Sequence, residues 1–581
     1  MTAPQGISPR RRIELGVLAI LAIALGALLL LRPFPSIPWM AAILAIALIV
    51  VGVLDLMDAE LRRNPVRLAV AVALPIVGVV LLAWRGLSIF GIAVAATIAL
   101  GVWGIGRWLR AARGAHAWWV DVLMGVAAIA AAVLALSWPG VSVFLTVQAV
   151  GVALIWRGGA ELIRVVRNRR KMVEAADSVS RWRTFLGTVA ALVAVAITVP
   201  LAIATFVVRG TAPVPGPFYQ ADLPTNTAPG TLLRVEPSTQ GTPTGARAWR
   251  ILYSTMRGNS PALASGTVLI PDTAPAKSGP RPVIAWAHGT TGVAENCAPS
   301  MMAEPFGHIP GLKQVIANGW ALVAADYIGL GTKGPSPYVI GEGEARSVLD
   351  SVRAARSLPD LTLSNQTVVW GHSQGGHAAL WTELLAPSYA PEVTIIGTAA
   401  QAPAANLQDL AVGMETMAGG SLLASYVLES YAQAYPDVSY ADYVKVQARL
   451  PIRGMASRCL SSKALPVSLA EALLLGKNFY SQPPTSGPLG VRLAENTPSA
   501  KLPYPTLISQ GLSDEVISPG SQNSFVADQC ATGSNVEYRT YPGLGHMTLI
   551  EDDSPAVPDL LSWTQARFDG APTTPNCPSA R

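Results

Sequence analysis

Long apolar runs dominate the first 209 residues of the chain. Seven of them are long enough to cross a bilayer, because about 20 apolar residues in a helix cover its hydrocarbon core. They are residues 13–31, 37–54, 66–84, 89–106, 118–136, 141–163 and 185–208. The pattern predicts a multi-pass α-helical membrane domain of about seven spans over residues 1–209. The first run ends without a small-residue cleavage site, so we expect a retained helix rather than a signal peptide.

Basic side chains are concentrated in alternate turns between these runs. Residues 1–209 carry 20 basic and 8 acidic side chains, a net charge of +12, whereas the rest of the chain carries 22 and 28, a net charge of −6. Because basic turns stay on the cytoplasmic side, the seventh run would exit outwards and place everything after Arg209 outside the cytoplasm. The basic residues flank apolar runs, where they orient membrane segments, so we expect no nucleic-acid partner.

A weak internal repeat runs through the membrane part. Three serines that follow Pro- or Gly-containing turns are each followed, 16 residues later, by a glycine: Ser36 and Gly52, Ser88 and Gly104, Ser142 and Gly158. The pattern is similar to that of the HdeD-type acid-resistance membrane proteins over about residues 13–165. It predicts three helical hairpins of one unit plus a seventh span, with small residues that let helices approach closely. No acid lies at mid-span, which favours an anchor or assembly module over a transporter.

The pattern changes after the membrane part. Residues 210–245 are rich in Pro, Gly and Thr and predict an extended linker. From Ala246 onward, short β-branched or apolar runs alternate with helical patterns, which predicts a mostly parallel, doubly wound sheet. The expected strands are 247–256, 266–270, 282–287, 321–325, 367–370, 394–399, 506–510 and 536–541. The expected helices are 342–358, 375–386, 519–528 and 557–568.

The alternation of strands and helices stops between residues 404 and 500, where apolar segments with helical spacing take over. We expect a helical cap there, inserted after the sixth strand. It would divide the core into a first part, 246–403, and a second part, 501–581.

The strongest chemical signal is the pentapeptide from Gly371 to Gly375, which follows an expected strand and precedes an expected helix. A G-x-S-x-G turn needs both glycines, because the backbone bends sharply at the serine and leaves no room for a neighbouring Cβ. The bend raises the serine Oγ above the sheet and aims the next N–H, that of Gln374, at the developing oxyanion. The motif predicts an α/β-hydrolase domain with Ser373 as nucleophile.

A nucleophilic serine at neutral pH needs a base, and only one histidine is suitably placed. In this fold the triad follows the chain order serine, acid, histidine. His546 lies in a Gly-rich loop after the last expected strand. The other histidines lie before the serine, beside it, or in a membrane-part turn: His116, His288, His308, His372 and His377.

The acid of the triad is expected in the loop after the strand 506–510. Asp514 is the first acidic residue there and precedes His546 by 32 positions. Its carboxylate would hold one imidazole nitrogen protonated and stabilise the imidazolium formed during attack. Glu515 is the competing candidate, and we expect it to face solvent.

The second oxyanion donor is expected after the strand 282–287, where such enzymes present a Gly-rich loop. Gly289 or Thr290 would supply that amide, and His288 would position the loop. The proposed chemistry implies no metal and no organic cofactor.

The four cysteines, Cys297, Cys459, Cys530 and Cys577, all lie after the membrane part. An even number in a domain expected outside the cytoplasm favours two disulfides over metal ligands, because no metal-binding spacing is present. Three pairings are open, and buried free thiols are the alternative.

Several motifs together resemble the secretory lipase family of fungi and actinobacteria over about residues 215–570. They are the HGTTG run at 288–292 leading to CAPS at 297–300, DYIGLG at 326–331, and the serine elbow. The resemblance implies a disulfide-bearing α/β hydrolase with a helical cap that acts on acyl esters, in an actinobacterial cell envelope. It also favours the pairings Cys297–Cys459 and Cys530–Cys577. The attached membrane domain departs from that family.

We therefore expect a membrane-tethered, extracytoplasmic serine hydrolase that cleaves lipid-like carboxylic esters through an acyl-enzyme. A serine peptidase or amidase on the same fold is one alternative, because the triad does not choose ester over amide. A membrane stress-response protein with an accessory hydrolase domain is another. A degenerate binding or sensor protein fits less well with an apparently complete triad.

Overall fold

The computed structural model of the protein describes residues 9–31, 89–114, 117–138, 176–210, 214–275, 279–359, 361–477 and 479–577, with scattered positions between 45 and 80 and between 151 and 165. The chain forms two compact units, which are described separately. The first, the membrane unit, comprises Met1–Thr211 with Val446–Pro451 and Ala470–Asn478. The second, the hydrolase unit, comprises Ala212–Lys445, Ile452–Leu469 and Phe479–Arg581.

Four long helices of the membrane unit coincide with expected spans: α1 (Pro9–Leu31), α4 (Ile89–Ala112), α5 (Trp118–Ser137) and α7 (Ala176–Gly210). Helix α5 packs against both α4 and α7. Within the described residues, two segments are long and apolar enough to cross a membrane, Trp118–Ser137 and Thr184–Thr205. The expected spans 37–54, 66–84 and 141–163 lie largely outside the described residues, so the number seven stays a prediction.

Small residues bring helices of this unit together, as the repeat predicts. A Cβ added at Gly158 would lie 2.6 Å from the carbonyl oxygen of Ala19, and one added at Gly104 would lie 3.2 Å from that of Gly125. The backbones at these two repeat positions therefore touch their neighbours directly.

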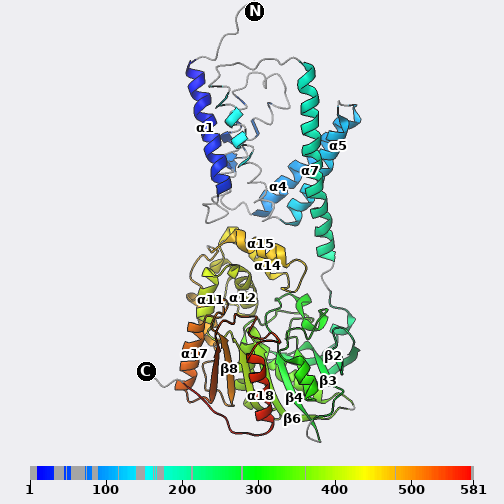
Figure 1. Ribbon diagram of the computed structural model, residues 1–581, viewed down its shortest axis with the longest axis vertical. Helices are drawn as coiled ribbons and strands as arrows, with labels where there is room; N and C mark the ends of the chain where they lie inside the picture. The colour runs from blue at the N-terminus through cyan, green and yellow to red at the C-terminus, as the bar shows by residue number, and fades with distance from the viewer. Residues whose placement is uncertain are drawn as a thin grey trace, which may run out of the picture. The chain divides into compact units, whose positions relative to one another are not determined.

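The hydrolase unit is built on a nine-stranded sheet of order β1-β2-β3-β5-β4-β6-β7-β8-β9 (Figure 1). The first three strands pair antiparallel, β3 pairs antiparallel with β5, and the rest are parallel. Their bounds are β1 Leu232–Ser238, β2 Ala246–Arg257, β3 Ser260–Pro271, β4 Arg281–Ala287, β5 Ala321–Ala325, β6 Leu363–His372, β7 Thr394–Gln401, β8 Thr506–Gly511 and β9 Val536–Tyr541. All eight expected strands are confirmed, and β1 is additional.

The expected linker 210–245 is wrong over much of its length. The 3-10 helix η2 (Pro217–Tyr219) is anchored by buried Tyr219, whose hydroxyl shares a 2.9 Å hydrogen bond with Ser300 Oγ. Strand β1 then pairs with β2 at the sheet edge. Pro237 is tolerated there because an edge strand has one side without ladder bonds. Composition suggested a linker, but backbone pairing decides the structure.

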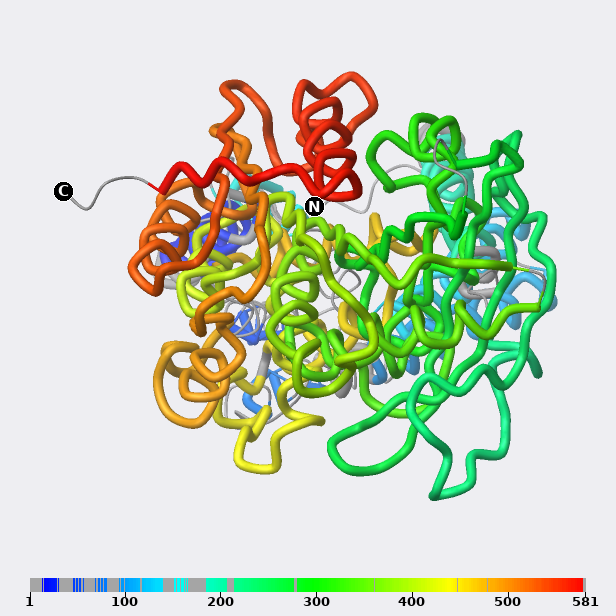
Figure 2. Tube along the Cα trace, turned by 90° about the horizontal axis from the view of Figure 1, so that it is seen from below, coloured from blue at the N-terminus to red at the C-terminus, as the bar shows by residue number. Residues whose placement is uncertain are grey.

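Helices cover both faces of the sheet. On one face lie α9 (Gly341–Arg356), α10 (Gln374–Tyr389) and α17 (Pro519–Ala531), and on the other α8 (Leu312–Ala317) and α18 (Ala556–Phe568). Successive side chains of β6 point to opposite faces of the sheet. Val369 packs in the core on the first face, and Val368 and Trp370 pack in the core on the second. Figure 2 shows the orange α17 and the red α18 at separate places in the hydrolase unit. The expected helices are confirmed.

Helices replace the strand alternation between β7 and β8, over the residues that were expected to form the cap. They are α11 (Leu407–Thr416), α12 (Gly420–Ala434), α13 (Tyr440–Tyr443), η5 (Val446–Ala448), α14 (Arg449–Ala456), α15 (Leu465–Leu475) and α16 (Gly487–Glu495). The insertion follows the seventh strand rather than the sixth, because β1 shifts the count.

Both disulfides that the resemblance favours are present, Cys297–Cys459 and Cys530–Cys577. The first joins the loop after β4 to the cap. The second joins α17 to the C-terminal segment after α18.

We expect the first disulfide to stabilise the hydrolase unit more than the second. Its ends are 162 residues apart, against 47 for the other, and a longer closed loop restricts the unfolded chain more. Replacing both members of either pair by Ala should cost about 2–5 kcal/mol, with a difference of roughly 1 kcal/mol between the pairs. Scanning fluorimetry of the two double variants measures this. An unchanged melting temperature for Cys297→Ala/Cys459→Ala would contradict the expectation.

Candidate active site

Ser373 lies in a sharp turn between β6 and α10. Its φ is 58° and its ψ is −119°, in the region that L residues rarely adopt. A Cβ added at Gly371 would lie 1.9 Å from the carbonyl oxygen of Gly375, and one added at Gly375 would lie 1.9 Å from that of Ala287. Both glycines are therefore required by contact, as the motif predicts.

Hydrogen bonds hold the backbone of Ser373 in this conformation. Its N–H donates to the carbonyl oxygen of Gln401 in β7 at 2.9 Å. Its carbonyl oxygen accepts from the N–H groups of His377 at 3.2 Å and Ala404 at 3.1 Å. The turn is thus fixed by the neighbouring strand, by its own helix and by the start of the cap.

Asp514 and His546 meet directly. Asp514 Oδ2 accepts from His546 Nδ1 at 2.9 Å. The other carboxylate oxygen accepts the backbone N–H groups of Val516 and Ile517, each at 2.8 Å. Because a carboxylate only accepts, Nδ1 carries the proton and leaves Nε2 as the basic nitrogen. This is the tautomer that a general base for a serine requires.

Glu515 has a different role. Its side chain is exposed, as expected, and its Oε2 accepts the backbone N–H of His546 at 3.2 Å. In the part of the chain that the structure describes, it makes no hydrogen bond to the imidazole ring, so of the two acids only Asp514 is placed to orient the base.

Histidine 372, beside the serine, connects the elbow to the histidine loop. His372 Nε2 donates to the backbone carbonyl oxygen of His546 at 3.0 Å, and the two ring centroids are 4.6 Å apart. Burial, together with the neighbouring His546, holds the pKa of His372 well below its ordinary value. His372 is therefore a neutral support for the loop. Sequence reasoning missed it, although the pentapeptide contains it.

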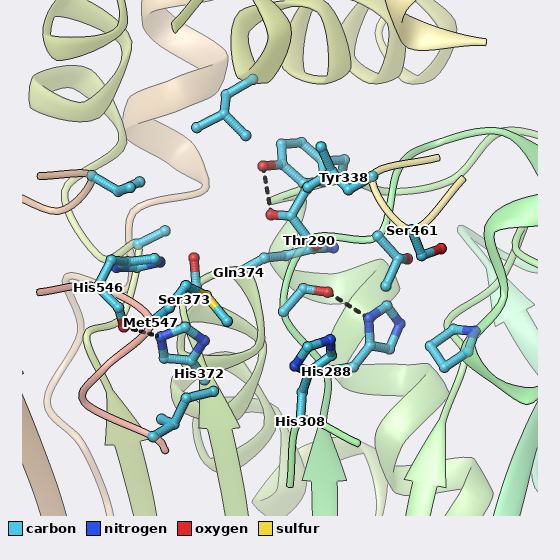
Figure 3. A pocket seen from close by; sticks show the side chains of 18 of the residues that line it. His288, Thr290, His308, Tyr338, His372, Ser373, Gln374, Ser461, His546 and Met547 are labelled. Carbon is cyan, nitrogen blue, oxygen red and sulfur yellow. Dashed lines mark hydrogen bonds between the residues drawn. The ribbon is translucent and has the colours of Figure 1, made fainter. Parts of the chain in front are cut away.

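Ser373 and His546 line one pocket. Figure 3 shows Ser373 beside His546 and Gln374. Within the described residues the structure records no hydrogen bond from Ser373 Oγ. Such bonds are often long in unliganded hydrolases and tighten when substrate binds.

The loop after β4 lies against the elbow. A Cβ at Gly289 would be 3.5 Å from His372 Nδ1 and 3.8 Å from Ser373 Cβ. The backbone N–H groups of Gly289, Thr290 and Gln374 make no hydrogen bond that the described structure records, which leaves them available to an oxyanion. The structure therefore brings all three expected oxyanion residues to the serine.

His288 holds this loop in place through its own contacts. Its ring stacks on Tyr327 with centroids 4.2 Å apart, and its Nε2 lies 3.1 Å from the carbonyl oxygen of Asp326. Burial lowers its pKa, so it stays neutral. Its contacts agree with the structural role expected for it.

The pocket is a cavity of about 370 Å³. Much of its wall is apolar and comes from the cap and the loops around it: Met302, Ile309, Leu410, Met414, Leu423, Leu460, Val516, Ile517, Met547 and Ile550. Sequence reasoning did not identify these residues, because they lie on separate elements with ordinary apolar spacing. Among the described residues, no group of three His, Cys, Asp or Glu side chains is arranged to hold a metal ion.

Comparison with known families agrees with this geometry. A family model described as "Secretory lipase" matches residues 310–576. The C-terminal region of this chain is similar to the secretory lipase family. In the membrane unit, a model described as "Short repeat of unknown function (DUF308)" matches residues 17–67 and 123–199. Both resemblances drawn from the sequence are confirmed.

Individual relatives support the assignment. Lipase A of Moesziomyces aphidis is 28% identical over 400 residues, which cover 62% of this chain and 81% of the relative. The crystal structure of Candida antarctica lipase A in its closed state matches with a TM-score of 0.52 and 20% identity, covering 63% of this chain and 89% of that one. The secretory lipase region therefore has a lipase-like α/β-hydrolase fold and falls among carboxylic-ester hydrolases.

One relative shows why the site itself matters. A "Probable inactive lipase" of Mycobacterium tuberculosis is 26% identical over 398 residues, covering 63% of this chain and 85% of the relative. Sequence similarity to lipases alone therefore does not establish hydrolase activity. The residues around Ser373 have to be tested directly.

We expect Asp514→Asn to lower kcat by about 10,000-fold, because an amide no longer holds Nδ1 protonated or stabilises the imidazolium. Glu515→Gln is the matched control. It perturbs one backbone hydrogen bond and should change kcat by no more than about tenfold. Ester turnover by the two purified variants measures this. Equal losses in both would show that Asp514 is not the orienting acid.

Proposed function

We propose that this protein is a membrane-tethered serine hydrolase that cleaves lipid-like carboxylic esters outside the cytoplasm. The observation that carries the proposal is the pocket that holds Ser373 and His546 together, with Asp514 bonded to the imidazole at 2.9 Å. The secretory lipase family and the names of the relatives support ester substrates.

In the proposed reaction, Ser373 Oγ attacks the ester carbonyl carbon while His546 Nε2 takes the hydroxyl proton. The oxyanion is stabilised by the N–H of Gln374 and by that of Gly289 or Thr290. His546 then donates the proton to the leaving alcohol, and an acyl-enzyme remains on Ser373. Water, deprotonated by the same histidine, attacks the acyl group and releases the carboxylic acid and free serine.

The pocket wall favours an acyl chain as the part of the substrate that it binds. Its apolar side chains would be removed from water by an alkyl chain, at about 25 cal/mol for each Å² buried. Met302, Met414 and Met547 add flexible side chains that adapt to irregular shapes. A peptide would leave its polar groups without partners against this wall, so we favour esters of fatty acids over amides.

Features of the membrane unit support the proposal that the protein is attached to a membrane. It carries the DUF308 matches and two described segments that are apolar and long enough to cross a bilayer. Pro217, where the hydrolase unit's first element begins, follows the second of these segments by only twelve residues. We propose that residues 1–209 are the membrane domain and that the core, 246–403 and 501–581, with its cap, 404–500, lies outside. Two disulfides fit that compartment.

A chain-length series of p-nitrophenyl esters, with an aminoacyl arylamide alongside, tests the reaction on the purified full chain. We expect ester turnover, no arylamide turnover, and loss of activity to near background in Ser373→Ala. Turnover of the arylamide alone, or ester turnover that survives Ser373→Ala, would refute the proposal.

Single introduced cysteines test the topology, because all four native cysteines are in disulfides. Glu551→Cys in the hydrolase unit and Arg113→Cys in the turn between α4 and α5 are both at exposed positions. In intact cells a membrane-impermeant maleimide should label Glu551→Cys only, and Arg113→Cys should react after lysis. The reverse pattern would place the hydrolase unit in the cytoplasm.

A further inference from the structure

We propose that Glu344 is a positioning residue that ties the oxyanion donors to the cap. The inference rests on the proposed function, because it assigns Gln374 and Thr290 to the oxyanion site. Neither Glu344 nor its partner His377 takes part in the reaction steps above. Both side chains are completely buried, at 0% exposure.

Glu344 bonds to two residues in the first turn of α10. Its Oε1 accepts from the side-chain Nε2 of Gln374 at 2.7 Å, and its Oε2 lies 2.9 Å from His377 Nδ1. Oε1 also accepts the backbone N–H of Val339 at 3.0 Å. Gln374 and His377 are one helical turn apart, so one carboxyl group holds both ends of the turn that presents the Gln374 N–H.

The proton positions follow from the partners. His377 Nε2 lies 2.8 Å from the backbone carbonyl oxygen of Asn496, which can only accept, so Nε2 carries a proton. One further proton lies between His377 Nδ1 and Glu344 Oε2.

Residues of the cap form the remaining hydrogen bonds of this network. Asn496, just after α16, accepts the N–H of Gly341 on its Oδ1 at 3.0 Å and donates from Nδ2 to the hydroxyl of Tyr435 at 2.7 Å. Tyr435 ends α12. In the same helix, Tyr431 donates its hydroxyl proton to the carbonyl oxygen of Val339 at 2.9 Å. Both α12 and α16 thus contact the residues around Glu344.

The second oxyanion donor is reached through the same loop. The backbone N–H of Tyr338 donates to Ser430 Oγ of α12 at 2.9 Å, and the Tyr338 hydroxyl shares a 2.9 Å hydrogen bond with Thr290 Oγ1, as Figure 3 shows. Val339, the next residue, is bonded to Glu344. The loop 338–339 therefore connects helix α12 both to Thr290 and, through Glu344, to Gln374.

This arrangement connects the position of the cap to the stabilisation of the transition state. An oxyanion donor acts only when its N–H is aimed at the place where the negative charge develops. When the cap is in its native position, it holds Glu344 and Tyr338 in place. These two residues in turn hold the oxyanion donors Gln374 and Thr290. Loss of the link should therefore lower kcat, with little effect on the binding of the ground-state ester.

Glu344→Ala in the full chain tests the inference, because it removes all three hydrogen bonds of the carboxylate. We expect kcat to fall about 10- to 100-fold, less than the 100- to 1,000-fold loss of a whole donor, with KM changed by less than about threefold. An alkyl trifluoromethyl ketone, whose serine adduct places an oxyanion in the same site, should bind more weakly by the same factor as kcat/KM falls. A purely structural role would not move these two values together.

Asp350→Ala is the matched control. Asp350 is another buried acid on α9, and neither it nor its partners Arg353 and Tyr389 line the pocket. We expect this variant to melt at a lower temperature but to keep its kcat and its affinity for the ketone.

A second pair of variants serves if Glu344→Ala does not fold. Tyr431→Phe removes one buried hydroxyl that donates to a carbonyl oxygen of the network, and Tyr253→Phe removes an equivalent one that donates to Ser347 in the core at 2.8 Å. We expect a loss of kcat and of ketone affinity in the first variant only.

Two results would overturn the inference. One is an unchanged kcat in folded Glu344→Ala or in Tyr431→Phe, and the other is an equal loss in a variant and its control. Failure of the proposed function looks different, because ester turnover would then be absent from the unmodified chain or would survive Ser373→Ala.

Discussion

The left-handed backbone conformation of Ser373 is the constraint on which the hydrolase unit depends. A non-glycine residue in a sparsely populated region costs about 1–3 kcal/mol and persists only where its surroundings determine it. Here β6 enters the turn, α10 leaves it, and β7 and the start of the cap bond to the same residue. Gly371 and Gly375 are glycines because backbone oxygens occupy the space that a Cβ would need. The turn between β6 and α10 is thus held in a form that places Ser373 at the pocket.

Three further segments converge on that hydroxyl. His372 fixes the histidine loop by a bond to the His546 backbone, and Asp514 fixes the ring by its bond to Nδ1. The loop after β4 brings Gly289 within van der Waals distance of the elbow. The disulfide from Cys297 joins this loop to the cap, whose next residues, Leu460 and Ser461, line the pocket. Positioning is therefore shared among backbone contacts from distant parts of the chain, and the reacting side chains are few.

The elbow, the histidine and the acid could be predicted because their chemistry requires a fixed order and a local motif. The eight strands followed from β-branched runs, but β1 did not, because it lies within the Pro-, Gly- and Thr-rich stretch 210–245 and forms a strand by pairing with β2. Glu344 could not be found, since it lies in an ordinary amphipathic helix and acts through contacts made after folding. His372 carried a signal in its position beside the serine, yet its role depends on a carbonyl group far along the chain. The cap residues of the pocket were unpredictable for the same reason.

The central claim is that one serine, activated by one histidine, carries the reaction. Peptide mass spectrometry after treatment of the full chain with an alkyl fluorophosphonate tests it most directly, because the reagent traps only an activated nucleophile. We expect a single adduct, on Ser373, that forms slowly or not at all in His546→Ala and in denatured protein. An adduct on another residue, or equal labelling of Ser373 without His546, would contradict it.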